Sequence, residues 1–205
     1  MPEQIIENYL TETIAAFHSY KKLAESAVEQ VSDEEFFKLI NAEANSIAVI
    51  FKHLGGNLRS RWSDFLMTDG EKADRRRDSE FVNYETDTRE GLTEFWESGW
   101  RILFKTLESL TVDDLGKTVK IRGEDFTVIK AINRALAHSA YHIGQITLLA
   151  KHFRSSEWET LSVPKNKSAE FNAYLAEKED KGNYLEAARE FTKDFEKLEI
   201  SGSGE

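Results

Sequence analysis

The chain has only two prolines, Pro2 and Pro164, so nothing in the long stretch between them forces a helix to stop. Apolar side chains recur along that stretch at the three- and four-residue spacing of amphipathic helices. The pattern predicts four long helices, over about residues 3–30, 33–65, 88–110 and 128–153. These elements predict an all-α fold, a four-helix bundle.

Several shorter features divide the chain between and after these helices. Ser32 to Glu35 forms a capping-box sequence that predicts the start of the second helix. Residues 68–87 are polar and charged without a clean period, which predicts a long crossover between the second and third helices. Gly55 and Gly56 fall inside the second predicted helix, where a glycine pair suggests a close approach of another backbone or a kink.

Short elements are predicted before and after the fourth helix. Residues 117–126 alternate weakly and predict a short hairpin around Arg122-Gly123, followed by Thr127 as the cap of the fourth helix. A short helix is predicted from Ser168. A last amphipathic helix over 184–198 and the tail SGSGE complete the chain. We therefore predict a bundle domain over residues 1–175 and a C-terminal helical extension over residues 176–205.

Composition narrows the class of protein. A formal charge of −10 argues against a general nucleic-acid binder. The longest apolar run, Ile47–Phe51, is far too short to cross a membrane. The first residues, MPEQIIENYL, lack the basic flank and apolar run of a secretory signal. Because the chain has no cysteine, disulfides and thiolate metal ligands are excluded, and we expect a cytoplasmic protein.

Histidines are the strongest candidates for chemistry. His138 and His142 stand four residues apart on the apolar face of the fourth helix, and His53 lies on the inward stripe of the second. Spacing of this kind is a weak signal by itself, because buried imidazoles can also be satisfied by neighbouring polar groups. A divalent metal would satisfy one nitrogen of each ring at once. His18 and His152 are not candidates for this metal site.

The stretch from Leu136 to Ile146, LAHSAYHIGQI, together with His53 resembles the DinB/YfiT-like superfamily of four-helix-bundle metalloenzymes. Two further stretches resemble a poorly characterised branch of that superfamily: HLGGNLRSRWSDFLMTDGEKADRRRDSEF over 53–81 and LSVPKNKSAEFNAYL over 161–175. The resemblance implies an up-down-down-up bundle, a divalent metal on His53, His138 and His142, and a homodimer. Relatives include metal-dependent transferases and isomerases that use bacillithiol, mycothiol or glutathione.

These observations leave three hypotheses for function. The first is a metalloenzyme, either a thiol-dependent S-transferase or a metal-dependent hydrolase. The second is a stress-response bundle that binds a metal or small ligand without turnover, and the third is a purely structural bundle. Imidazole ligands suit zinc or nickel, and iron or manganese are also compatible with the resemblance. The absence of an H-E-x-x-H motif gives a zincin peptidase little support.

Positive charge in an acidic chain marks candidate substrate-binding residues. Carboxylate or phosphate groups are expected to bind at Arg59, Arg61, Arg76 and Lys165. Gln145, one turn after His142, is expected to bond a ligand or a group that supports the metal ligands, and the alternative is a polar network in the core. The alternative for the run Arg75 to Arg77 is surface pairing with Asp74, Asp78 and Glu80.

An acidic residue and three tryptophans complete the candidates for the site and the core. Glu43 is the nearest acidic residue on roughly the face of His53. Core positions are predicted for Trp62, Trp96 and Trp100.

Overall fold

The computed structural model describes residues 2–178, 187–188 and 190–192. The chain divides after Phe153 into two compact units. The elements of the first are α1 Pro2–Glu29, α2 Asp33–Phe37, α3 Ile47–Trp62, η1 Arg77–Phe81, α4 Arg89–Ser109, η2 Val112–Asp114, β1 Thr118–Ile121, β2 Glu124–Thr127 and α5 Val128–Arg154. The described structure is mostly helical, which agrees with the predicted all-α class.

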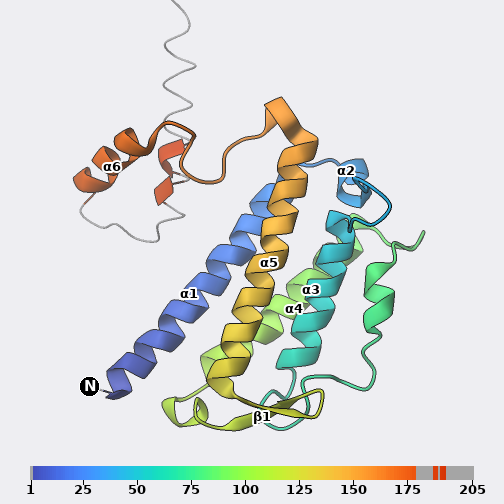
Figure 1. The fold of residues 1–205 in the computed structure, drawn as a ribbon, viewed down its shortest axis with the longest axis vertical. Coiled ribbons are helices and arrows are strands. Elements are labelled where there is room, and N and C mark those ends of the chain that lie inside the picture. Colours follow the sequence, from blue (N-terminus) through green and yellow to red (C-terminus); the bar gives the residue numbers. More distant parts are fainter. Residues whose placement is uncertain (1, 179–186, 189, 193–205) are drawn as a thin grey trace, which may run out of the picture. The chain divides into compact units, whose positions relative to one another are not determined.

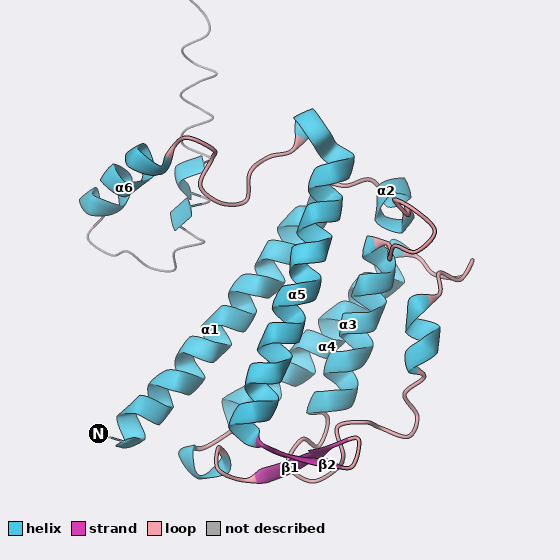
Figure 2. Cartoon of the chain, in the orientation of Figure 1, coloured by secondary structure: helices cyan, strands magenta, loops and turns pink. Residues whose placement is uncertain are grey.

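The long helices of the first unit lie alongside one another (Figure 1). Helices α1 and α5 rise from the end of the unit that carries the hairpin, whereas α3 and α4 descend towards that end. The strands β1 and β2 form an antiparallel pair at this end, shown in magenta in Figure 2. Helix α5 begins directly after β2, with the Thr127 hydroxyl accepting from the Lys130 amide at 3.2 Å. The predicted hairpin and its cap are therefore confirmed.

The single helix predicted over 33–65 is wrong. Helix α2 ends at Phe37, α3 begins at Ile47, and Leu39 and Ile40 between them are 46% and 49% exposed. The Ser46 hydroxyl accepts from the Val49 amide at 3.1 Å and caps a new helix. The apolar period runs across the break because both helices face the same core, with the Phe36 and Phe51 ring centroids 5.3 Å apart.

The glycine pair in α3 allows close packing against α4. A Cβ atom on Gly99 of α4 would lie 2.8 Å from the Gly55 carbonyl oxygen and 3.1 Å from the Gly55 Cα. A Cβ atom on Gly55 would lie 2.8 Å from the Phe95 ring. Beside this contact the core contains the three fully buried tryptophans Trp62, Trp96 and Trp100, as predicted. Of the two sequence readings, the close backbone approach is correct, and α3 continues through the pair.

We expect Gly99→Ala to destabilise the protein although alanine is the better helix former. The new methyl would meet backbone, which cannot rotate away, and overpacking costs about 1–3 kcal/mol. Gly144→Ala on α5 is the matched control, because nothing lies within 4 Å of a Cβ atom there. That variant should gain up to about 1 kcal/mol from helix propensity. Urea unfolding measures both, and a stabilised Gly99→Ala protein would contradict the packing.

The crossover between α3 and α4 is tied to the hairpin and contains the helical turn η1. The Asp69 carboxylate accepts from the backbone amides of Arg122 and Gly123 at 2.8 and 2.7 Å. The Gly70 amide donates to the Lys120 carbonyl at 2.8 Å. The crossover is therefore held in place, and η1 lies against α3 (Figure 1).

The second unit carries η3 Ser155–Glu157 and α6 Ser168–Glu177. The helix predicted from Ser168 is confirmed, and its Phe171 forms a buried cluster with Ala187, Ala188 and Phe191. The predicted helix over 184–198 and the tail SGSGE lie largely outside the described residues. The domain boundary at residue 175 stays a prediction. None of the described helices combines the length and apolar character needed to cross a membrane.

Candidate metal centre

Helices α3 and α5 bring three histidines together. One ring nitrogen from each of His53, His138 and His142 lies within 4.8 Å of the others. His53 and His142 are buried, His138 is half-buried, and the Nε2 atoms of His53 and His138 are 3.3 Å apart. His53 and His138 thus meet although they are 85 positions apart in the sequence. Three convergent imidazole nitrogens form a donor set that suits a divalent transition metal.

Glu80 of η1 fixes the orientation of His53. Its Oε2 atom lies 2.9 Å from His53 Nδ1. Because a carboxylate oxygen accepts, the ring donates from Nδ1 and keeps the Nε2 lone pair for the cluster. A carboxylate behind a histidine is the usual support of a metal-binding imidazole. The Phe81 ring, with its centroid 4.7 Å from that of His53, packs beside it.

Arg75 holds Glu80 in turn. Its guanidinium donates from Nε to Oε1 and from Nη2 to Oε2, each at 2.8 Å. Burial would raise the pKa of Glu80, but the hydrogen bonds from His53 and Arg75 outweigh it and hold that pKa below its ordinary value. The side chains of Arg75 and Glu80 are only 4% and 8% exposed, so this is a buried ion pair. The carboxylate facing His53 is therefore ionised at neutral pH.

Gly56 provides the space for this carboxylate. A Cβ atom on Gly56 would lie 2.3 Å from Glu80 Oε1 and 2.9 Å from Glu80 Cδ. The two adjacent glycines of α3 thus have different roles, since Gly55 admits α4 and Gly56 admits Glu80. Any larger residue at position 56 would push Glu80 away from His53.

The histidines of α5 are held in their neutral form. His142 Nδ1 lies 2.9 Å from Gln145 Oε1, and since an amide oxygen only accepts, the ring donates from Nδ1. Burial, followed by the neighbouring histidines, lowers the pKa of His138 to about 3. Burial and His53 lower the pKa of His142 to about 4, although the bond to Gln145 opposes this. Both rings therefore present unprotonated nitrogens at neutral pH, as metal binding requires.

These shifts predict a pH dependence for the metal-free protein. The folded pKa values of His138 and His142 lie below the unfolded value of about 6.5, so unfolding takes up about two protons as pH falls. Their contribution to stability is present above about pH 6.5 and is lost as pH falls towards the folded values. Urea unfolding of chelator-treated protein from about pH 7.5 to about pH 5 measures it, because most carboxylates stay ionised there. His138→Gln with His142→Gln should flatten the slope, and an unchanged slope would contradict the assignment.

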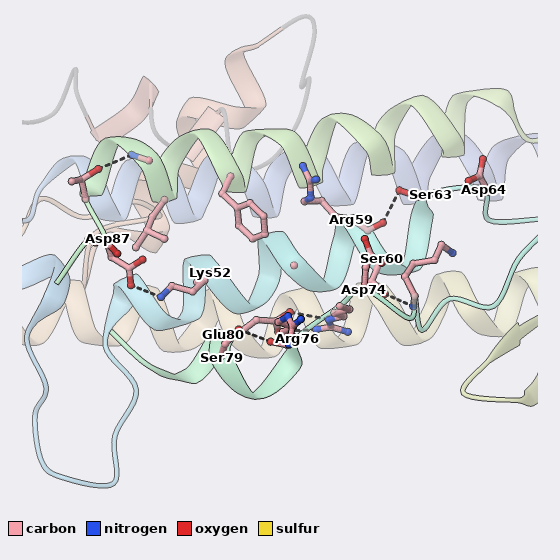
Figure 3. Close-up of a pocket in the computed structure, with 18 residues that line it drawn as sticks. Lys52, Arg59, Ser60, Ser63, Asp64, Asp74, Arg76, Ser79, Glu80 and Asp87 are labelled. Carbon is pink, nitrogen blue, oxygen red and sulfur yellow. Dashed lines mark hydrogen bonds and ion pairs between the residues drawn. The ribbon is translucent and has the colours of Figure 1, made fainter. Parts of the chain in front are cut away.

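The predicted substrate-binding residues occupy different places. Arg61 is buried and pairs with Glu71 at 2.8 Å, and Lys165 belongs to the second unit. Arg59 and Arg76 are exposed and line a cavity of about 740 Å3 bounded by α3, α4 and the segment around η1 (Figure 3). The three histidines are not among the residues that line this cavity. Gln145 accepts a hydrogen bond from His142, and its role towards a ligand stays a prediction.

Sequence reasoning missed the roles of Glu80 and Arg75. The sequence suggested surface pairing for Glu80, and surface pairing or anion binding for Arg75, but the two form a buried ion pair. Arg77 does pair with Asp78 at 3.8 Å in an exposed position. Glu43, the acidic residue noted near His53, is exposed in the loop between α2 and α3. The glycine at position 56 was the one available signal, because its missing side chain makes room for Glu80.

Among known proteins, the chain matches one family model. No curated protein and no solved structure matches the chain. A family model described as a protein of unknown function, DUF1572, matches residues 4–167, which includes all three histidines, Glu80 and Arg75. The chain therefore belongs to the DUF1572 family.

Proposed function

We propose that this protein is a DinB-like metalloenzyme of the cytoplasm that uses a divalent metal, zinc or nickel, to transfer a low-molecular-weight thiol. The long helices would form the up-down-down-up bundle of that superfamily. The observation that supports the proposal most directly is the cluster of three convergent histidine nitrogens within 4.8 Å. A divalent ion there would supply Lewis acidity that favours ionisation of a thiol or of water.

The surrounding residues hold and orient the ligands. Glu80 fixes the tautomer of His53, and Gln145 does the same for His142. Arg75 keeps Glu80 ionised and in place. Three imidazole ligands would leave at least one position of a four-coordinate ion open, which is the arrangement of catalytic and not of structural zinc sites.

The acid–base groups favour thiol transfer over hydrolysis. Hydrolysis needs a base for the proton of water, but Glu80 already accepts from both Arg75 and His53. Within the described residues, no Asp or Glu joins the histidine cluster. A thiol, with an ordinary pKa of about 8.5, needs less assistance to ionise than water does. We therefore place the thiol-dependent S-transferase first and the hydrolase second.

Turnover assays with metal-loaded protein test the proposal. We expect consumption of glutathione or bacillithiol in the presence of an electrophilic aryl halide, and loss of it after chelation or in His138→Ala. Hydrolysis of p-nitrophenyl acetate without thiol would favour the hydrolase. Stoichiometric metal binding with no turnover in either assay would favour the alternative, a bundle that binds a metal or small ligand without catalysis.

We also propose a homodimer, which follows mainly from the superfamily resemblance. Helix α5 exposes Tyr141 and Leu148, which are two turns apart and 64% and 69% exposed. Light scattering should give twice the chain mass of 23.5 kDa, and Tyr141→Ser with Leu148→Ser should return it to the single mass. A monomer mass for the unsubstituted protein would refute the dimer.

A further inference from the structure

A cavity of about 740 Å3 lies beside α3, and none of the three histidines is among its lining residues, which Figure 3 draws. It is bounded by α3, by α4 and by the segment that carries η1. Its size is that of a small-molecule site, which typically spans about 300–1,000 Å3. Glu80 and Arg75 belong to its wall, so the cavity touches the residues that support His53 without containing the histidines.

The charged groups of the wall are not all paired. Arg75 is engaged by Glu80, and Lys52 is engaged by Asp87. Arg59 donates to the Ser98 hydroxyl at 2.9 Å, and Arg76 is exposed. In the described part of the chain, no ion pair joins Arg59 or Arg76 to a carboxylate. Two guanidinium groups therefore remain available to an anion in a chain whose net charge is −10.

The two arginines lie on different sides of the cavity. Figure 3 shows Arg59 on the side of α4 and Arg76 beside Ser79 and Glu80. Apolar wall is supplied by Leu92 and Phe95 of α4, and the Arg59 guanidinium carbon lies 5.2 Å from the centroid of the Phe95 ring. A ligand in this cavity would contact both guanidinium groups and an apolar surface. This combination suits an anion attached to an aromatic or aliphatic body.

We propose that this cavity binds a small organic anion, with its carboxylate or phosphate group at Arg59 and Arg76 and its apolar body against Leu92 and Phe95. The proposal goes beyond the metal-dependent reaction, because neither the histidines nor a metal takes part in the binding. Arg75 and Glu80 also line the cavity and stay paired with each other.

Binding of phenyl phosphate to the chelator-treated protein tests the proposal by titration calorimetry. We expect one saturable site per chain. Inorganic phosphate and benzyl alcohol, which each lack one half of the ligand, should bind at least about tenfold more weakly. Benzoate in place of phenyl phosphate shows whether the site prefers carboxylate or phosphate. Absence of saturable binding for both anions, or equal binding of benzyl alcohol, would overturn the proposal.

Charge-matched variants locate the site. Arg59→Gln with Arg76→Gln should weaken phenyl phosphate binding at least about tenfold. Arg77→Gln with Arg101→Gln removes the same charge from exposed residues outside the cavity wall and should leave binding unchanged. Equal losses in the two pairs would show general charge attraction and overturn the proposal. Amide shifts on titration should include Gly56 and Gly91 and spare Gly144, and the reverse pattern would contradict the location.

The test is independent of the metal-dependent reaction. His138→Ala with His142→Ala should bind phenyl phosphate as the unsubstituted protein does, because neither residue lines the cavity. Loss of anion binding in that variant would assign the anion to the histidine cluster and overturn the separate site. Failure of the thiol-transfer assay alone would leave the anion site standing.

Discussion

His138→Ala with His142→Ala should abolish the binding of divalent metal. Protein purified without an affinity tag is expected to carry one ion per chain, since three buried or half-buried imidazoles converge within 4.8 Å. Removing two of the three ligands leaves only His53, which is hydrogen-bonded to Glu80. A single imidazole binds a metal ion too weakly to retain it during gel filtration. Elemental analysis after gel filtration measures the loss.

The matched control is His18→Ala with His152→Ala. It also removes two histidines, but both are exposed and outside the cluster, so metal content should stay at one ion per chain. Equal metal content in both double variants would refute the metal centre. Stripping the ion from the unsubstituted protein should lower the melting temperature, since a ligand at about a thousand times its dissociation constant adds about 4 kcal/mol.

Glu80→Ala should be the most damaging single substitution near the centre. It leaves the Arg75 guanidinium buried without its main partner, and breaking a buried pair in this way costs about 3–5 kcal/mol. Glu71, whose Oε2 atom is 3.6 Å from Arg75 Nη1, offsets part of that cost, so we expect about 3 kcal/mol. Loss of the acceptor for His53 should also weaken metal binding about 10–100-fold.

Two controls separate these effects. Asp78→Ala removes a nearby acid whose side chain is fully exposed and should change the free energy of unfolding by less than about 0.5 kcal/mol. Glu80→Gln keeps an acceptor for His53 and removes the charge, so metal affinity should fall less than in Glu80→Ala. Urea unfolding and zinc titration measure the two quantities. A Glu80→Ala protein as stable as Asp78→Ala would contradict the buried pair.

Helix content and the histidines could be predicted from the sequence because both depend on local patterns. Apolar spacing predicted α1, α4 and α5 closely, and caps such as Thr127 marked where a helix begins. The pair His138 and His142 is a local spacing on one helix face, which α5 preserves. The same reasoning failed between α2 and α3, because the apolar period continues although the chain leaves the helix at Phe37 and resumes at Ile47.

What surrounds the histidines was decided by the tertiary structure. Glu80 meets His53 across 27 positions of the sequence, and no spacing rule links a residue in a charged crossover to one in a helix. The contact exists because the crossover is tied to the hairpin through Asp69 and because Gly56 leaves room for the carboxylate. Burial then turns an ordinary Arg–Glu pair into a costly and specific one. By itself, then, the sequence determined most of the helices and the histidines that could bind a metal, since these follow from short-range periodicity. Packing alone decided which charged side chains support the histidines and which face the cavity.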